Sequence, residues 1–146
     1  MSGKRLMIGL LAFAAVFAAA LVWFQFFAFY ESVSEVGALT VAGRAVPVDG
    51  YEGIDASSSP LKRRGCFRAD PAAFAGAAPA PEAEPLVAPF WFRCFDARAL
   101  SLDLDAGRAA AFALATDAPE GFDTIVALYP DGRGYLWRQL NDRYRN

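Results

Sequence analysis

Hydrophobic residues run without interruption near the start of the chain. Residues 6–24 contain no charged residue and no Asn, Gln or Pro, and after Gln25 aromatic residues continue to Tyr30. A helix rising about 1.5 Å per residue needs about 20 such residues to cross a bilayer's hydrocarbon core. A buried core helix is usually shorter and amphipathic, whereas this run is apolar on every face. The pattern therefore predicts a transmembrane helix over residues 6–30.

A cleavable signal peptide is the main alternative for this segment. Signal peptides have an apolar region of about 7–15 residues that ends at a small-x-small cleavage site. Here the small residues Ala18–Ala20 lie in the middle of the run, and the bulky stretch LVWFQFFAFY follows them. We therefore expect an uncleaved signal anchor.

The charges beside this segment predict its orientation. Lys4 and Arg5 precede it, and the first acidic residue of the chain is Glu31. By the positive-inside rule, residues 1–5 stay in the cytoplasm and residues 31–146 are exported. We expect a single-pass protein of a bacterial inner membrane with a periplasmic C-terminal domain.

Aromatic residues crowd the far end of the segment. Trp23 and Tyr30 carry amphipathic rings, which settle at the depth of the lipid headgroups, so both are expected at the outer membrane interface. The phenylalanines between them are better explained as lipid-facing bulk. Membrane lipid is thus an expected partner through residues 6–30.

In the rest of the chain, hydrophobic positions recur in short runs between turn formers, which predicts strands. Residues 38–48 alternate and turn at Gly43, so they predict one or two short strands. Residues 122–130 and 134–140 flank PDGR, a hairpin signal in which Pro fixes φ and Gly accepts a positive φ. Residues 108–116 predict a further antiparallel strand.

One segment carries helix start and stop signals. Asp96 can cap a helix over residues 97–106, Phe95 and Leu100 occupy hydrophobic-staple positions, and Gly107 follows as a stop. The stretch LSLDL also alternates as a strand would, but the agreement of start and stop favours the helix. The predicted class is α+β: a transmembrane helix, then a small antiparallel sheet of three to five strands with a C-terminal hairpin and about one packed helix.

Two segments predict loops. Residues 49–60, DGYEGIDASSSP, are dense in turn formers and predict an irregular loop. Residues 69–89 are rich in Ala and Pro, which also predicts a loop.

The two cysteines predict a disulfide. An exported domain meets an oxidising compartment, and two cysteines allow one intrachain pairing, Cys66 with Cys94. We expect it to tie together two short strands or strand ends, LKRRGCFR and FWFRCFD. Closing a loop of about 29 residues would remove roughly 3.6 kcal/mol of unfolded-state entropy. Redox catalysis is the alternative, but redox cysteines usually form a C-x-x-C motif and these do not.

Charge and composition exclude several function classes. Residues 31–146 hold all 16 acidic residues and all but two of the 14 basic residues, without a basic stripe, which argues against a nucleic-acid partner. The chain has no histidine, the commonest general base and metal ligand. Residues 59–62, SPLK, match the S-x-x-K pair of penicillin-binding enzymes, but Ser59 precedes a proline and the companion motifs are missing, so a serine-rich turn is the better interpretation. We expect no catalytic site, no metal, no cofactor and no enzymatic activity.

A basic segment is one candidate contact surface. It concentrates four cations, Lys62, Arg63, Arg64 and Arg68. A domain held close to a membrane could bind an anion or a lipid headgroup with them. The alternative, which we favour, is an edge strand protected by charge.

An aromatic segment is the other candidate. Phe90, Trp91 and Phe92 precede Cys94, and in an extended segment some of these rings must face outward because neighbours alternate sides. An exposed aromatic patch marks a partner site, and packing over the disulfide explains the same residues equally well.

Three stretches carry a resemblance to a known family: GIDASSSPLKRRGCF, PLVAPFWFRCFDA and DTIVALYPDGRGYLWRQLN. Together with the N-terminal anchor, they resemble an uncharacterised alphaproteobacterial family of small single-pass membrane proteins, known only as a domain of unknown function. The resemblance spans nearly the whole chain and implies no activity, substrate or cofactor.

Our leading hypothesis is therefore non-catalytic. The protein would be a membrane-anchored periplasmic accessory, assembly or scaffold protein that docks onto another membrane or envelope protein. A periplasmic module that binds a ligand or an anionic lipid through residues 62–68 is the alternative, and an enzyme of unrecognised type is a remote one.

Overall fold

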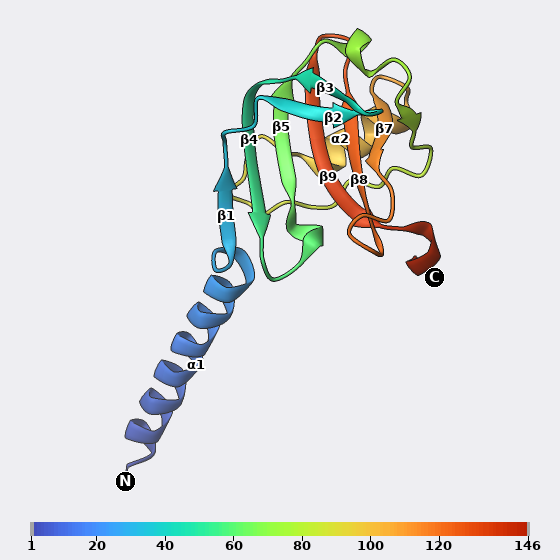
Figure 1. Cartoon of the computed structure of the whole chain (residues 1–146). Coiled ribbons are helices and arrows are strands. Elements are labelled where there is room, and N and C mark those ends of the chain that lie inside the picture. Colours follow the sequence, from blue (N-terminus) through green and yellow to red (C-terminus); the bar gives the residue numbers. More distant parts are fainter. Residues whose placement is uncertain (1, 146) are drawn as a thin grey trace. The chain divides into compact units, whose positions relative to one another are not determined.

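The structure, a computed structural model, describes residues 2–145 (Figure 1). Residues 1 and 146, the ends of the predicted cytoplasmic segment and of the predicted periplasmic domain, lie outside the described residues. The chain divides into two compact units, with the boundary between Tyr30 and Glu31. The first is helical and the second is built mainly on an antiparallel sheet, which confirms the predicted α+β class.

The first unit is the helix α1, Gly3–Phe26. It is long and apolar enough to cross a membrane, and none of its side chains is buried in the protein. An N-terminal signal sequence passes the same test of length and apolar composition. The helix ends before Tyr30, which was expected at its end and instead begins the strand β1.

The second unit contains a seven-stranded sheet in the order β1-β4-β5-β9-β8-β7-β6. The pairs from β4 to β6 are all antiparallel. The strands are β1 (Tyr30–Val33), β4 (Asp49–Ala56), β5 (Arg64–Arg68), β6 (Ala78–Pro79), β7 (Ala110–Ala115), β8 (Phe122–Leu128) and β9 (Arg133–Leu140). The predicted hairpin at the C-terminal end is β8–β9, but the sheet is larger than the three to five strands expected.

A hairpin covers one face of this sheet. It consists of β2 (Ala38–Val41) and β3 (Arg44–Pro47), and Figure 1 shows it crossing in front of the longer strands. Below it, the Tyr51 ring lies over Gly65 and the Phe67 ring lies over Gly134, where a Cβ atom would collide with them. The main core of the domain forms here, from Leu39, Val41, Val46, Val48, Tyr51, Phe67, Phe74, Val126, Leu128 and Leu136.

The helix α2, Ala97–Asp105, packs behind the sheet (Figure 1). Asp96 caps it, since the Asp96 carboxylate accepts a 3.0 Å hydrogen bond from the Ala99 N–H. Phe95 and Leu100 are both buried, and the Phe95 ring meets the Trp137 ring edge-on with centroids 6.2 Å apart. The predicted start of this helix is therefore confirmed.

The prediction of an irregular loop over residues 49–60 is wrong for most of this segment. Instead of an irregular loop, residues 49–56 form β4, which pairs along its length with β5. Tyr51 and Ile54 are buried, so the turn-forming composition was overridden by tertiary packing. The strand keeps one local irregularity, a register shift between Asp49 and Glu52.

The basic segment also differs from expectation. Lys62 ends a short 3₁₀ helix, Pro60–Lys62, which Ser59 caps by accepting a 3.3 Å hydrogen bond from the Leu61 N–H. This cap accounts for the serine of SPLK. The following strand, β5, lies between β4 and β9, so it is not the charge-protected edge strand that the sequence favoured.

The segment around the second cysteine is not a strand. Residues 91–96 contain turns and irregular backbone, and they cross behind the sheet without joining its hydrogen-bond ladder. The alanine-proline tract at 69–89 is largely a loop as expected, interrupted by a 3₁₀ helix, Pro71–Phe74, and by the two-residue strand β6.

Candidate functional site

The residues between β6 and α2 form a strap behind the sheet, defined here as residues 80–94 (Figure 1). At the start of the strap, the Ala80 N–H donates a 3.0 Å hydrogen bond to the carbonyl of Ala111 in β7. Three further sets of contacts fix it to the sheet.

Arg64 makes the central attachment. This arginine is only 5% exposed, and its guanidinium donates hydrogen bonds to the strap carbonyls of Leu86 (3.0 Å) and Val87 (3.2 Å). The same group donates to the Leu61 and Arg63 carbonyls and lies over the Phe95 ring, 5.7 Å from its centroid. A buried cation is tolerated when it is hydrogen-bonded in this way, and here its donors hold the strap against β5.

The disulfide closes the strap at its end. Cys66 in β5 is bonded to Cys94, with Cα atoms 6.3 Å apart. This is the pairing that the sequence predicts, although Cys94 lies in a turn. Because Arg64 and Cys66 alternate with Gly65, they project from the same face of β5 and act on the same part of the strap.

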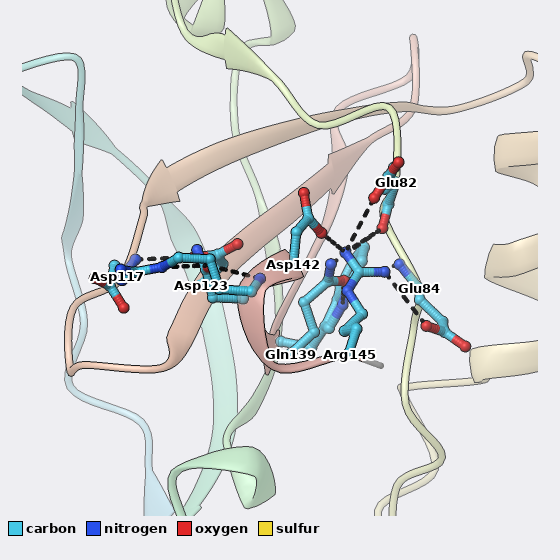
Figure 2. Close-up of polar contacts among 10 residues, drawn as sticks. Glu82, Glu84, Asp117, Asp123, Gln139, Asp142 and Arg145 are labelled. Carbon is cyan, nitrogen blue, oxygen red and sulfur yellow. Dashed lines mark hydrogen bonds and ion pairs between the residues drawn. The ribbon is translucent and has the colours of Figure 1, made fainter.

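Gln139 and Arg145 hold the beginning of the strap (Figure 2). The Gln139 side chain accepts from the Glu84 N–H at 2.8 Å and donates to the Glu82 carbonyl at 3.1 Å. The guanidinium of Arg145 also donates to the Glu82 carbonyl, at 3.1 Å, and lies 2.7 Å from the Asp142 carboxylate. Gln139 is buried, so its amide is matched to this one backbone conformation.

Despite these attachments, the strap exposes two large apolar side chains. Val87 is 84% exposed and Phe90 is 68% exposed. Phe92, two residues later, is buried, and Trp91 is half-buried. In the described part of the second unit, the only other exposed large hydrophobic residues are Leu102 and Tyr144, and both are less exposed than Val87 and Phe90.

A shallow groove of about 360 Å³ adjoins these two residues. Apolar side chains of the strap and of the segment leading into α2 line it, and two exposed cations, Arg93 and Arg98, flank it. The one carboxylate in its lining, Asp96, already accepts a hydrogen bond as the helix cap. The groove therefore combines apolar surface with positive charge.

A second groove, of about 280 Å³, lies where the strap meets the ends of β8 and β9 (Figure 2). Its polar side chains are partnered with one another: the Asp123 carboxylate accepts from the Asp117 N–H at 2.9 Å and from the Asn141 amide at 2.9 Å. A backbone hydrogen bond from Gly121 holds the pKa of the neighbouring Asp117 carboxyl below its usual value, and Arg143 adds to this. These contacts join the loop before β8 to the end of β9 and stabilise the fold there.

Another polar cluster joins α2 to the sheet. The Tyr129 hydroxyl donates to the Asp103 carboxylate at 2.5 Å, and the Arg108 guanidinium donates to the same carboxylate at 2.7 Å. Both contacts lower the pKa of Asp103, while burial and then the Asp103 hydrogen bond raise the pKa of Tyr129. The arrangement fixes the C-terminal half of α2. Within residues 2–145, no group of three or more potential ligands is placed to hold a metal ion.

The structure separates the four predicted basic contacts. Arg64 is buried under the strap, whereas Arg63 precedes it and projects to the opposite face. Arg68 is exposed and donates to the Asp131 carbonyl at 3.5 Å, and Lys62 lies in the 3₁₀ helix. They do not form one surface.

The aromatic candidates are likewise divided. Phe90 is exposed and Phe92 is buried, so only one of these two rings is available at the surface of the domain. Of the two predicted interface aromatics, Trp23 lies on α1 with its ring stacked on Phe27, and Tyr30 begins β1.

The sequence did not reveal the role of Gln139, Arg145 or Val87. Gln139 sits in a strand whose alternation predicts only that it shares a face with Trp137. Val87 lies in a tract that predicts a loop, and nothing local indicates which loop residues are fixed. Val87 differs from its neighbours in this tract only by its large exposed fraction in the folded domain.

Comparisons with known proteins identify a family and give no activity for the chain. No curated protein and no solved structure shows significant similarity to the chain. A family described as of unknown function, DUF6446, matches residues 33–146, which is most of the chain. The protein therefore belongs to the DUF6446 family of unknown function.

Proposed function

We propose that this is a single-pass membrane protein whose second unit lies outside the cytoplasm and binds another membrane or envelope protein, without catalysis. One observation carries the proposal: the strap is fixed by Arg64, by the disulfide and by Gln139, yet it exposes Val87 and Phe90. Exposed apolar side chains held in a defined conformation are what a docking surface requires.

The charge and cysteine pattern supports the orientation. Lys4 and Arg5 precede α1, and cytoplasmic flanks are the ones enriched in Lys and Arg. The Cys66–Cys94 bond fits an oxidising compartment. A bacterial inner membrane with the domain in the periplasm satisfies both, and an alphaproteobacterial source is what the sequence resemblance implies.

The groove beside Phe90 indicates the chemistry of the partner. Its apolar lining accepts a hydrophobic side chain, and the flanking guanidiniums of Arg93 and Arg98 favour a carboxylate next to it. We therefore propose that the partner presents a segment with an apolar residue adjacent to Asp or Glu. Aromatic and Arg side chains are the residues that most often dominate such interfaces.

Site-specific photocrosslinking tests the docking surface. A photoreactive amino acid replaces Phe90 in the full-length protein, and a matched control replaces Leu102, which is 55% exposed on α2. We expect one predominant heterologous adduct at position 90, mapped to an acidic-apolar segment and lost when Arg93→Glu is added. Equal adducts from both positions, or adducts only with a second copy of this chain, would refute the proposal.

Cysteine labelling in cells tests the orientation separately. Ser57 is exposed in the second unit and Ser2 precedes α1. In cells whose outer membrane is permeabilised, an impermeant maleimide should label Ser57→Cys and leave Ser2→Cys unlabelled. The reverse pattern would place the domain in the cytoplasm.

A further inference from the structure

Two arginine side chains lie next to each other at one end of the sheet. Arg64 of β5 pairs with Trp137 of β9, so continuing this register by one residue places Arg63 opposite Arg138. Because neighbouring residues alternate sides, Arg63 and Arg138 share the face that carries the β2–β3 hairpin. Like charges directly opposite each other destabilise a sheet, so this pair needs an explanation.

The neighbours of the pair offset the charge of Arg138 only in part, because Asp55 raises its pKa less than burial and Arg63 lower it. The register of β4 with β5 places Asp55 beside Arg63, on the side away from Arg138. On its other side, Arg138 pairs with the uncharged, buried Thr124. Among the described residues, the Arg138 Nε atom is buried and has no hydrogen-bond partner. Burial, and then the positive charge of Arg63, lower the pKa of Arg138.

A buried hydroxyl lies beside the two guanidiniums. Tyr51 is 5% exposed, its ring lies over Gly65, and the positive charge of Arg63 acts on its hydroxyl. Burial raises the pKa of Tyr51, so the hydroxyl keeps its proton at neutral pH and can donate it to an acceptor. The end of the sheet thus offers two cations and one neutral donor on one face, with one carboxylate, that of Asp55, on the outer side of Arg63.

We propose that Arg63 and Arg138 bind a phosphate-bearing anion, with the Tyr51 hydroxyl as a further donor. Guanidinium groups match phosphate oxygens in geometry, and one anion placed between them replaces their repulsion by two attractions. The site differs from the basic segment seen in the sequence: it keeps Arg63, excludes Arg64 and Arg68, and gains Arg138 from a strand more than 70 residues later.

The position of the site favours a phospholipid headgroup as the source of the phosphate. The Val33 carbonyl of β1 lies next to Gly53, and β1 runs antiparallel to β4 (Figure 1), so Glu31 lies toward the end of β4 that carries Asp55. The chain therefore enters the domain at the end of the sheet where the arginines lie. This source rests on the proposed function, because a membrane that holds α1 keeps its lipids at high local concentration around the tethered domain.

Thermal unfolding of the full-length protein in uncharged detergent tests the site. The probes are dihexanoyl-phosphatidylglycerol and inorganic phosphate, and zwitterionic dihexanoyl-phosphatidylcholine serves as the lipid control. We expect phosphatidylglycerol to raise the unfolding temperature of the wild type by about 3 °C or more, because it binds only the folded state. Arg138→Gln should abolish the rise in unfolding temperature. Arg68→Gln, the same change at an exposed arginine outside the proposed site, should keep it.

A second readout does not depend on the ligand. Without any anion, Arg138→Gln should unfold at the same temperature as the wild type or higher, because the substitution removes the like-charge contact. A rise with phosphatidylglycerol but not with phosphate at equal concentration assigns the lipid, and an equal rise with both assigns free phosphate to the same site. No rise in the wild type with either probe, an equal rise in Arg138→Gln, or marked destabilisation of that variant without anion would overturn the proposal.

Discussion

Replacing Arg64 by methionine should release the strap. The substitution removes the donors to the Leu86 and Val87 carbonyls and keeps an apolar side chain of similar length beside Phe95. Each hydrogen bond to a charged group contributes about 1.5–3 kcal/mol, so the two strap bonds represent about 3–6 kcal/mol. Removing a buried cation recovers part of this, and the freed carbonyls can bind water, so the expected loss is about 3 kcal/mol.

That loss is a large share of the roughly 5–15 kcal/mol that stabilises a domain, so it is measurable by urea unfolding of the full-length protein in detergent. Trp137 is fully buried and reports the transition by fluorescence. Arg68→Met is the matched control, because Arg68 is exposed and should change stability by less than about 0.5 kcal/mol. Equal unfolding of the two variants would show that Arg64 does not hold the strap.

A glutamate-specific protease measures release of the strap itself. Glu82 and Glu84 lie between the two cysteines, so a cut at either residue leaves the fragments joined until the disulfide is reduced. Cleavage that appears only after reduction should be faster in Arg64→Met than in Arg68→Met. If the two variants are cut at the same rate while only Arg64→Met is destabilised, the arginine supports the sheet and not the strap.

Three other perturbations have defined outcomes. Cys66→Ser should lower the free energy of unfolding by up to about 3.6 kcal/mol, the entropy of a closed loop of about 29 residues, and a loss below about 1 kcal/mol would contradict this account of the disulfide. Gly65→Ala places a Cβ 2.4 Å from the Tyr51 hydroxyl and should lower the free energy of unfolding in urea by about 1–3 kcal/mol. In the control Gly37→Ala, the new Cβ meets nothing within 4 Å, so the stability should not change. Equal stability of the two variants would argue against the position of the Tyr51 ring. The pKa of Asp117 is lowered in the folded state, so its contribution to stability is complete above its unfolded pKa of about 4 and is lost as pH falls through the lower folded pKa. Asp117→Asn should therefore make the urea unfolding midpoint less dependent on pH in that acid range. A midpoint that varies with pH as in the wild type would count against this role of Asp117.

Local signals were sufficient where a few adjacent residues decide the structure. The turn between β8 and β9, residues 129–132, follows from Asp131 and Gly132, since Gly132 has φ +95°. The start of α2 follows from Asp96, whose side chain caps it. A few residues that are adjacent in the sequence determine such elements, so they can be predicted without knowing what packs against them.

Strand β4 shows why other elements could not be predicted. Its glycines resemble turn formers in the sequence, yet Gly53 is buried and a Cβ there would lie 2.5 Å from the Tyr51 ring. The partner glycine on β5, Gly65, faces the same ring. The glycines are therefore needed for an aromatic side chain to lie across two strands, a requirement that depends on register and not on local conformation.

The basic run KRR failed as a surface prediction for a related reason. A cluster of charges usually indicates solvent exposure, but Arg63 and Arg64 follow one another at the start of a strand and so point to opposite faces. Which face is covered depends on the strap, which contacts this strand from more than 20 residues further along the chain. The sequence could predict that cations gather here, but not that one of them is buried and another faces Arg138.

The strap is held in one conformation although few of its own side chains are buried. Fixing the backbone of one residue costs about 1–2 kcal/mol, yet within the strap only Pro89 and Phe92 are buried, so the segment recovers little by burying its own side chains. Its prolines reduce the entropy lost on folding, and Arg64, Gln139 and the disulfide supply the remaining stabilisation from outside the segment. A loop that only linked β6 to α2 would need none of these attachments. Holding Val87 and Phe90 in one conformation before a partner arrives lowers the entropy cost of binding, and that is the physical reason to interpret the strap as a docking surface.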